Sequence, residues 1–526
     1  MDPVLEGLAA NPALPPDLLD RLVAFAVRSG GETLSYLGLE DRGDLSREQV
    51  LALAGCDRAT AAALARRGLL DAADVDPGAG PKAALALLDA GRGLPGWPRL
   101  LARHPDPAVR EELAACPGLP PGVTALLAAD PDLGVVTELA GWGSPDPESA
   151  AALAAHPHAG VRRAAAANPA TPPELLAALL TGKGLPPAAA CEVCDREPVP
   201  FGHDPHCPRT DCDLPAGAAC DGSHQSTVHD TRWAALDNPA TPAEAAARFA
   251  DDPSPLLRAA VARRAGLPPA VYARLARDEV PGVRWDAAAN PALGEALVRE
   301  LATTGEPEVL RGLARHPRLP LDLLTALAGG LRAGPEPLPR IASATAAEVE
   351  ELAGSAHPGV RMLVAQRRDL PPGVRDALAA DPDQKVAGAV AAHPGLAPDL
   401  LRAMAARHGV RVLAQVAANP GAPPDLLEEL VRHDPPPVRV LRAVAVHPRA
   451  TAAALHACLA DPKARVRAAA HPALAPADLR SLLEDPAYGV ASAAAAHPSL
   501  PAALVRELFA LRVPAGPETR TAPGRP

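Results

Sequence analysis

Aromatic side chains are scarce in this chain and make up only 2% of its 526 residues. A core built on large rings is therefore excluded. Long apolar runs are also missing, because no stretch reaches the roughly eighteen residues that a membrane span needs. The first residues, MDPVLEGLAANP, contain neither the basic nor the apolar segment of a secretion signal. These absences predict a cytoplasmic protein that does not enter a membrane.

Positive charge is in deficit. The chain has 51 Lys and Arg against 62 Asp and Glu, a formal net charge of -11. An acidic chain is repelled by a phosphate backbone, so nucleic acid is not the expected partner unless a local basic face exists. The sequence also lacks a nucleotide-binding glycine loop, a nucleophile elbow and a paired-carboxylate motif in the right context. We therefore expect a protein partner and no enzymatic activity.

Proline, in contrast, is abundant: the 64 prolines forbid long uninterrupted helices. They recur with a period. Asn-Pro and His-Pro dipeptides follow one another at intervals of 26, 28, 24 and 26 residues, at Pro394, Pro420, Pro448, Pro472 and Pro498. A second mark, Asp-Pro, falls between them at Pro435, Pro462 and Pro486. Each unit therefore divides into two elements, each opened by a proline turn.

The two elements of a unit predict two short helices. One is leucine-rich and amphipathic, as in NPGAPPDLLEELVRHD, and the other is alanine-rich, as in PHAGVRRAAAANP. Helices this short are marginal alone, so each depends on stacking against its neighbours. The sequence thus predicts an all-α solenoid of two-helix repeats of about 26 residues.

The expected organisation has four parts. We expect N-terminal repeats over 1–187 (degenerate over 24–100), a cysteine-rich insertion over 188–231, C-terminal repeats over 232–511 and a disordered tail over 512–526. Within the degenerate stretch, Ser46 is a predicted helix N-cap, and the glycine- and proline-rich residues 76–88 are a predicted loop.

Two polar features recur with the repeat, and both have structural interpretations. A Val-Arg pair follows many of the turns and predicts an Asp–Arg hydrogen-bond ladder between stacked repeats. Its arginines are Arg110, Arg162, Arg284, Arg361, Arg411, Arg439 and Arg467. Histidine precedes proline where asparagine stands in equivalent turns, which predicts a turn-capping role rather than metal binding. The histidines are His104, His156, His316, His357, His393, His447, His471 and His497, and the asparagines are Asn11, Asn168, Asn238, Asn290 and Asn419.

Five of the eight cysteines lie in one short window, at Cys191, Cys194, Cys207, Cys212 and Cys220. Crowded thiolates in a loop-rich stretch of a reducing compartment indicate a metal or a cluster. The spacing does not choose the metal, because the second C-x2-C knuckle typical of zinc is missing and His203, His206 and His224 are spare ligands. Four of the five cysteines are the expected ligand set. The three cysteines outside the window, Cys56, Cys116 and Cys458, are expected to behave as small apolar residues.

The repeat register locates the insertion. Pro420 precedes Arg439 by 19 residues, so Pro169 predicts an arginine at position 188, yet the pattern resumes 44 residues later at Arg232. The segment is therefore inserted between the two helices of one repeat and should project from an edge of the stack. It has few apolar residues and is expected to fold only with its ligand bound.

Units such as NPGAPPDLLEELVRHDPPPVRVLRAVAVHP resemble those of the leucine-rich repeat variant family. That resemblance implies a right-handed superhelix in which α-helices alternate with 3₁₀-helices. Members of the family can carry a small cysteine-rich domain with a 4Fe-4S cluster, and the window from Cys191 to Cys220 is similar to it. In the family this domain precedes the repeats, whereas here repeats lie on both sides of it.

A second resemblance concerns residues 220–224, which spell CDGSH. This is the motif of a family of 2Fe-2S proteins with three cysteine ligands and one histidine, and it implies Cys220 and His224 as ligands. The family's upstream C-x-C pair is absent here. From the sequence we expect a repeat scaffold carrying a 4Fe-4S cluster, with an electron-transfer or redox-sensing role. A structural zinc without redox function and a 2Fe-2S cluster are the alternatives.

Overall fold

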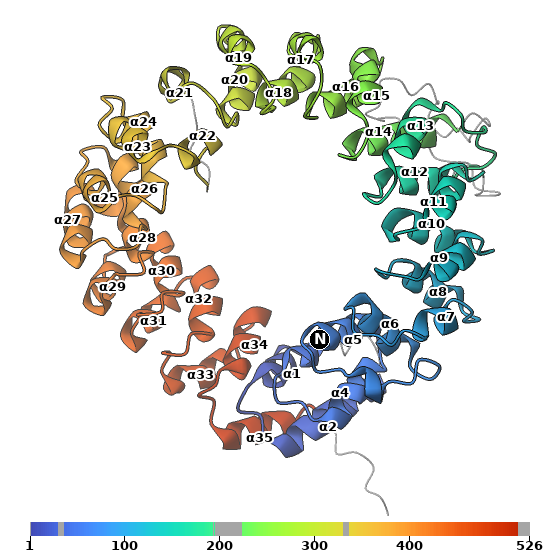
Figure 1. Ribbon diagram of the computed structural model, residues 1–526. Helices are drawn as coiled ribbons and strands as arrows, with labels where there is room; N and C mark the ends of the chain where they lie inside the picture. Colours follow the sequence, from blue (N-terminus) through green and yellow to red (C-terminus); the bar gives the residue numbers. More distant parts are fainter. Residues whose placement is uncertain (1, 30–35, 193, 195–223, 330–335, 514–526) are drawn as a thin grey trace, which may run out of the picture. The chain divides into compact units, whose positions relative to one another are not determined.

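The computed structural model describes residues 2–29, 36–192, 194, 224–329 and 336–513, and within these ranges all regular structure is helical apart from one isolated bridge between His158 and Ala190 (Figure 1). The chain forms two compact units. Unit 1 comprises 1–70, 333–337 and 344–526, and unit 2 comprises 71–332 and 338–343. Three of the predicted metal ligands, Cys207, Cys212 and Cys220, and nearly all of the predicted tail lie outside the described residues.

Unit 1 joins helices from both ends of the chain. They are α1 (Pro3–Ala10), α2 (Pro16–Ser29), η1 (Leu39–Asp41), α4 (Arg47–Ala54), α5 (Arg58–Arg66), α23 (Ala346–Ala353), α24 (Pro358–Ala365), α25 (Pro372–Ala379), α26 (Gln384–Ala391), α27 (Pro398–His408), η4 (Gly409–Arg411), α28 (Leu413–Ala417), α29 (Pro424–Val431), α30 (Val438–Val444), α31 (Ala452–Cys458), α32 (Pro462–Ala469), α33 (Pro476–Leu482), α34 (Tyr488–Ala496) and α35 (Ala502–Ala510).

Unit 2 holds the middle of the chain. Its helices are η2 (Ala72–Asp74), α6 (Pro81–Asp89), α7 (Trp97–Leu101), α8 (Pro107–Ala114), α9 (Pro121–Ala128), α10 (Leu133–Trp142), α11 (Pro147–Ala154), α12 (Ala159–Ala167), α13 (Pro173–Thr181), α14 (Gln225–Asp237), α15 (Ala243–Ala247), η3 (Arg248–Asp251), α16 (Pro255–Ala262), α17 (Pro269–Leu275), α18 (Pro281–Ala289), α19 (Glu295–Ala302), α20 (Pro307–Ala314), α21 (Leu321–Leu327) and α22 (Pro339–Ala342).

The helices of each unit stack in two layers, as the repeat predicts. The leucine helices pack on one another, as α9 does on α11 and α11 on α13, and the alanine helices form the other layer, as in the series α8, α10, α12 and α14. Many helices begin with proline in the first turn, where the missing N–H costs nothing. Leu426, Leu427 and Leu430 of α29 are buried, as the amphipathic pattern predicts. The all-α solenoid is confirmed.

The 3₁₀ alternation implied by the family resemblance is not what the described residues show. The second helix of most repeats is an α-helix of two turns or more, such as α12 with 9 residues and α34 with 9 residues. Alanine favours the α-helix, and runs of 3₁₀-helix beyond one turn have poorer hydrogen bonds. Short 3₁₀ segments remain at η1, η2, η3 and η4.

The degenerate stretch contains one confirmed and one wrong prediction. Ser46 caps α4 in a capping box with Gln49. Residues 76–88, predicted as a loop, instead contain most of α6, which begins at Pro81. Leu85 and Leu87 of α6 are fully buried, so tertiary packing outweighs the glycines that precede the helix.

Asparagine in the proline turns caps the turn and joins successive repeats, and so do His447, His471 and His497, but His393 contacts the Pro394 carbonyl instead. Asn419 donates from Nδ2 to the carbonyls of Ala391 and His393 (2.6 and 2.9 Å), and its Oδ1 accepts from the N–H of Gly421. His447 repeats the pattern: Nδ1 accepts from the Arg449 N–H, so Nε2 carries the proton that it donates to the Asn419 carbonyl, 2.8 Å away. The predicted capping role is confirmed.

The histidines do not all occupy the asparagine position, contrary to the expectation. Those that precede a leucine helix do so, but three lie in the other turn, before an alanine helix: His104, His156 and His357. Their Nδ1 atoms still accept from the backbone N–H two residues on. Burial lowers the pKa of His156 below its usual range and favours this neutral form.

The stack runs through the insertion without a break. Asn290 donates to the carbonyl of Ala262, which lies 28 residues earlier, whereas Asn238 donates to the carbonyl of Ala166, which lies 72 residues earlier. The difference of 44 residues equals the delay in the repeat pattern between position 188 and Arg232. α14 packs on both α12 and α13, so the repeat closes around the inserted segment. The boundary expected at residue 231 falls inside α14.

Arginine–carboxylate pairs form a second ladder. Arg361 binds both carboxylate oxygens of Asp381 (2.7 and 3.0 Å) and also donates to the carbonyls of Ser355 and Ala356. Burial acts to raise the pKa of Asp381, but the hydrogen bonds from Arg361 and from the Asp383 N–H, together with the charge of Arg361, hold that pKa below its usual range. The ladder residues are Arg110–Asp130, Arg258–Asp278, Arg284–Glu306, Arg361–Asp381, Arg442–Asp461 and Arg465–Asp485.

The Val-Arg dipeptide identified this ladder only in part. Arg162 donates to backbone carbonyls instead, among them that of Pro186. Three other predicted members, Arg411, Arg439 and Arg467, make no ion pair within the described ranges. Three ladder arginines, Arg258, Arg442 and Arg465, do not follow valine, whereas Arg439 follows Val438 and lies exposed.

Arg361→Ala is expected to lower the free energy of unfolding by about 3 kcal/mol, because it leaves the carboxylate of Asp381 buried without its cation. Arg439→Ala is the matched control and should change stability by less than about 0.5 kcal/mol. Urea denaturation followed by circular dichroism measures both. Equal effects of the two substitutions would contradict the assignment of the ladder.

The N-terminal helices continue the C-terminal repeats within unit 1. α1 packs on α34, and Asn11 donates to the carbonyls of Ala495 and His497 (2.8 and 3.1 Å), in the same way that Asn419 donates to those of Ala391 and His393. A Cβ on Gly7 would lie 2.1 Å from the Ser492 carbonyl oxygen, so only glycine allows this approach. The two ends of the chain therefore complete one repeat between them.

Candidate metal centre

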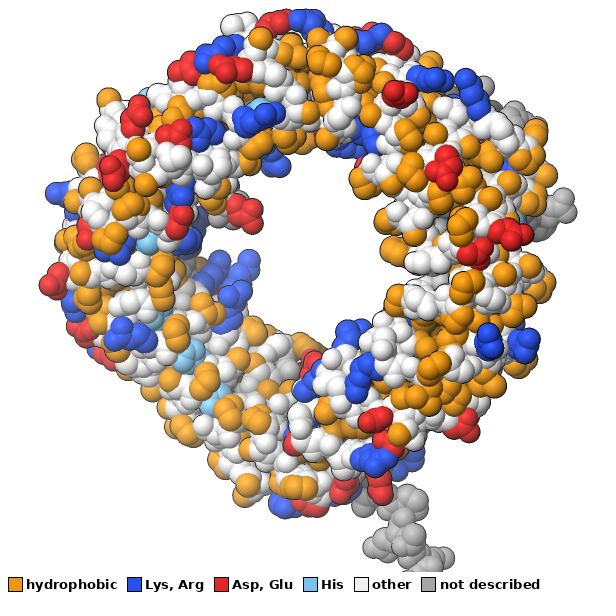
Figure 2. Space-filling view, in the orientation of Figure 1, with side chains coloured by type: hydrophobic (Ala, Val, Ile, Leu, Met, Phe, Trp, Pro, Cys, Tyr) orange, Lys and Arg blue, Asp and Glu red, His pale blue; other side chains and the backbone are white. Residues whose placement is uncertain are grey.

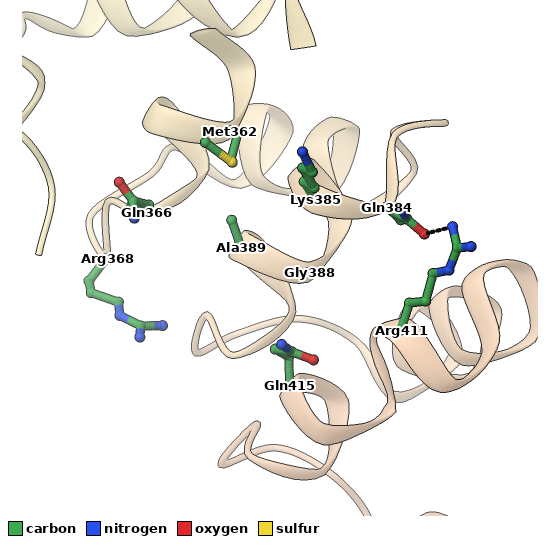
Figure 3. Close-up of a pocket in the computed structure, with 9 residues that line it drawn as sticks. All are labelled: Met362, Gln366, Arg368, Gln384, Lys385, Gly388, Ala389, Arg411 and Gln415. Carbon is green, nitrogen blue, oxygen red and sulfur yellow. Dashed lines mark hydrogen bonds between the residues drawn. The ribbon is translucent and has the colours of Figure 1, made fainter. Parts of the chain in front are cut away.

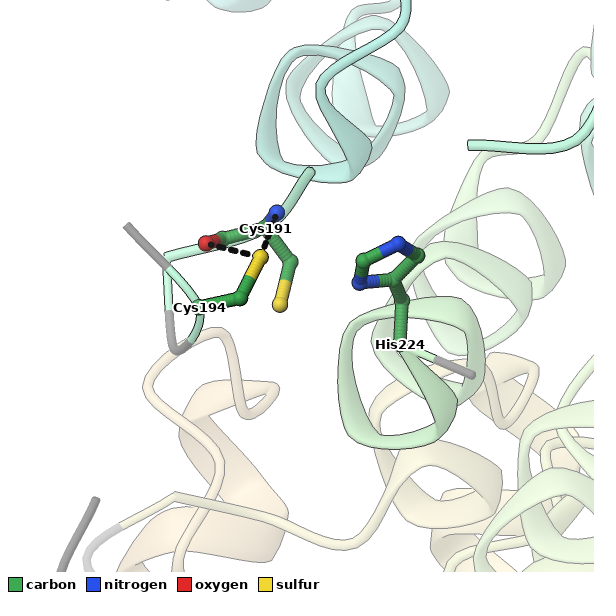
Figure 4. Close-up of side chains that lie close together, drawn as sticks. All are labelled: Cys191, Cys194 and His224. Atoms are coloured by element: carbon green, nitrogen blue, oxygen red, sulfur yellow. Dashed lines mark hydrogen bonds between the residues drawn. The ribbon is translucent and has the colours of Figure 1, made fainter. Parts of the chain in front are cut away.

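Three predicted ligands come together where the insertion leaves and rejoins the array. Cys191 and Cys194 lie at its start and His224 at its end, and their ligand atoms are all within 4.8 Å of one another (Figure 4). Cys191 is buried, with 1% of its surface exposed, while Cys194 is exposed and His224 is buried. His224, which follows the two cysteines by 30 residues or more, is thus brought beside them.

The first side of the site is held on the repeat by backbone bonds. The Ala189 N–H donates to the Pro157 carbonyl (2.8 Å), and the Ala159 N–H donates to the Ala190 carbonyl (2.9 Å). Arg162 of α12 donates to the Pro186 carbonyl (2.7 Å). The backbone on which Cys191 stands is therefore fixed to the turn before α12.

The C-x2-C pair forms a compact turn. The Cys191 N–H points at Cys194 Sγ, 3.1 Å away, and Cys194 Sγ lies 3.4 Å from the Cys191 carbonyl oxygen. These two contacts hold Cys194 Sγ beside the backbone of Cys191, so the turn places both sulfurs on one side of the segment. Both sulfurs face the ring of His224 in Figure 4.

The other side of the site begins α14. His224 is its N-cap residue and has φ 53°, in the left-handed region. Non-glycine residues adopt this region seldom, and such strain concentrates at functional positions. α14 itself is fixed by the stack, where His229 lies within hydrogen-bonding distance of Ser254 Oγ (2.9 Å). The rigid array therefore presents the imidazole to the two sulfurs.

The donor set fits a metal ion. A tetrahedral zinc ion binds thiolates at about 2.3 Å and imidazole nitrogens at about 2.0 Å, which places its ligand atoms within about 4 Å of each other. The observed group is close to that spacing and needs one further ligand. The predicted ligands that could supply it, Cys207, Cys212 and Cys220, lie outside the described residues.

Two of the three cysteines beyond the window behave as expected, whereas Cys56 is half-buried. Cys116 and Cys458 are buried, with 1% and 0% of their surfaces exposed. Burial raises the pKa of the Cys458 thiol to about 12, so this residue stays protonated and apolar. Sequence reasoning named His224 as a spare ligand and through the CDGSH motif, but nothing in the sequence showed that the two ends of the insertion lie close together.

No family model matches the chain, and no curated protein matches it. A solved structure described as "a leucine-rich repeat variant with a novel repetitive protein structural motif" aligns over 49% of this chain and 90% of that chain, with 25% sequence identity and a TM-score of 0.26. A superposition this loose carries no argument on function. No helix in the described part of the chain combines the length and apolarity required to cross a bilayer.

Proposed function

We propose that the chain is a repeat scaffold for protein interaction, and that a metal ion bound by Cys191, Cys194 and His224 holds the cysteine-rich segment to the array. The observation that carries this is the convergence of three ligand atoms to within 4.8 Å. Ligands that share one ion lie this close, whereas each thiolate of a 4Fe-4S cluster binds its own iron at a separate corner. The geometry therefore favours one zinc-type ion.

The ion would have a structural role. Zinc has no redox chemistry and acts here as a cross-link between the two ends of the inserted segment. A segment with few apolar residues gains its folding free energy from such a bond. The segment would then present a fixed surface beside the stack to a partner.

An iron-sulfur cluster is the second candidate, because the window offers five cysteines where one ion needs at most four. A 4Fe-4S cluster would take four of Cys191, Cys194, Cys207, Cys212 and Cys220. A 2Fe-2S cluster would use three cysteines and His224. Either would add an electron-transfer or redox-sensing role to the scaffold.

Metal analysis after anaerobic purification tests the proposal. We expect one zinc per chain in the natural sequence, and its loss in Cys194→Ser and in His224→Ala. Cys56→Ser, outside the window, is the matched control and should keep the metal. Far-UV circular dichroism should change little in all variants, because α12, α13 and α14 pack on one another directly.

The outcomes separate the candidates. Iron with labile sulfide in place of zinc would exclude the single-ion site and support the cluster. A metal retained by both Cys194→Ser and His224→Ala would contradict the assigned ligands. A protein that binds neither metal would overturn both candidates.

A further inference from the structure

A cavity of about 500 Å³ opens on the alanine-helix layer of unit 1, between α24, α26 and α28 (Figure 3). It is lined by Met362, Gln366, Arg368, Gln384, Lys385, Gly388, Ala389, Arg411 and Gln415. Arg368 and Arg411 stand on opposite sides of it in Figure 3, with Lys385 between them. Neither the repeat pattern nor the cysteine window predicted this site.

The lining contains three cations and no carboxylate. Arg368 and Lys385 make no ion pair within the part of the chain that the structure describes. The neighbouring Arg367, in contrast, pairs with Asp369, and Arg361 pairs with Asp381. Although the chain has a net charge of -11, the lining of this cavity is therefore positively charged and can bind an anionic ligand. Figure 2 shows Lys and Arg side chains collected over this stretch of the array.

A second cavity, of about 410 Å³, adjoins the first and shares Gln384 and Arg411 with it. Arg407 and His408 extend the basic lining, and the one carboxylate, Asp383, accepts the N–H of Lys385 as the cap of α26. The two cavities therefore form a continuous basic track across successive repeats.

Two polar atoms in this track are buried without a hydrogen-bond partner in the described residues: Oε1 of Gln415 and Nε2 of His408. Native proteins seldom leave such atoms unsatisfied, because each costs about 1–3 kcal/mol. Oε1 of Gln415 can only accept, so any N–H or O–H donor would satisfy it. Both atoms are shielded from solvent, whereas Arg368, Lys385 and Arg411 are exposed, so these cations set the class of ligand, which is anionic.

We propose that this track binds an extended acidic segment of a partner protein. Its carboxylates would pair with Arg368, Lys385 and Arg411. The inference names the class of partner for the scaffold function proposed above and rests on it.

A nucleic acid fits less well. No aromatic side chain lines either cavity, so bases would have nothing on which to stack. The acidic chain as a whole repels a long polyanion, whereas a short acidic segment meets only the local basic track.

Fluorescence anisotropy with a labelled glutamate-rich peptide tests the proposal on the full chain. We expect binding that weakens as salt rises and that falls about tenfold for each cation removed in Arg368→Ala, Lys385→Ala and Arg411→Ala. The matched control removes the same charge elsewhere, in Arg439→Ala, Arg467→Ala and Arg480→Ala, and should bind normally. The same peptide with glutamine in place of glutamate should not bind.

Each contrary outcome is distinct. Equal binding by the track variant and the control variant, or stronger binding of an oligothymidine than of the peptide, would overturn the inference. Absence of peptide binding in a protein that holds its metal would reject the acidic partner and leave the metal-stapled scaffold standing. The Cys194→Ser variant should still bind the peptide, because Cys194 belongs to unit 2 whereas the basic track belongs to unit 1.

Discussion

Hydrogen exchange in α34 and α35 is expected to accelerate more than about a hundredfold when residues 2–29 are deleted from the chain. The deletion removes α1, which packs on both helices, and α2, which contacts α35 through the Asp17–Arg506 ion pair and through Arg21 over the Phe509 ring. It also removes Asn11, the donor to the carbonyls of Ala495 and His497. Leu5, Leu8 and Leu22 are buried in this contact region, so their loss exposes an apolar face of the last repeat.

The substitution Gly7→Ala tests the same contact between α1 and α34 by adding one methyl group. Its Cβ would lie 2.1 Å from a backbone oxygen of α34, so α1 must move away, at a cost of about 1–3 kcal/mol. Gly373→Ala in α25 is the matched control, since nothing lies within 4 Å of its Cβ. Exchange in α34 that is the same in both variants would show that the two ends of the chain do not close this repeat.

Asn419→Ala is expected to lower the free energy of unfolding by about 3 kcal/mol. Asn419 is fully buried, and its removal leaves the carbonyls of Ala391 and His393 and the N–H of Gly421 without their partners. Each buried unsatisfied group costs about 1–3 kcal/mol, partly relieved by water at the turn. The midpoint of urea denaturation measures the loss.

Asn419→His is the matched variant, because histidine makes the same two kinds of bond at His447. It should recover more than half of the stability that alanine loses at neutral pH. If alanine and histidine prove equally destabilising, or both harmless, the turn residues do not join the repeats in the way described.

The repeat was predictable because its signals are local. Proline marks the first turn of the helices, and the exchange of Asn and His in one turn predicted capping before any contact was known. The Arg ladder was harder, because the valine before the arginine marks only half of its members. Arg442 reaches Asp461 while Arg439 lies exposed, although only Arg439 follows valine directly after the turn.

The sites depended more on distant contacts. The C-x2-C pair identified Cys191 and Cys194, but its approach to His224 follows from how the stack closes around the insertion. The basic track was invisible in the sequence, since Arg368, Lys385 and Arg411 occupy different positions in three successive repeats. No periodic pattern connects them, and only the packing of α24, α26 and α28 does.

X-ray absorption spectroscopy at the metal edge tests the central claim most directly. The account predicts a zinc edge, with sulfur ligands at about 2.3 Å and a nitrogen ligand at about 2.0 Å, the latter lost in His224→Ala. An iron edge with metal–metal scattering, or a zinc shell of sulfur alone that is unchanged in His224→Ala, would contradict it.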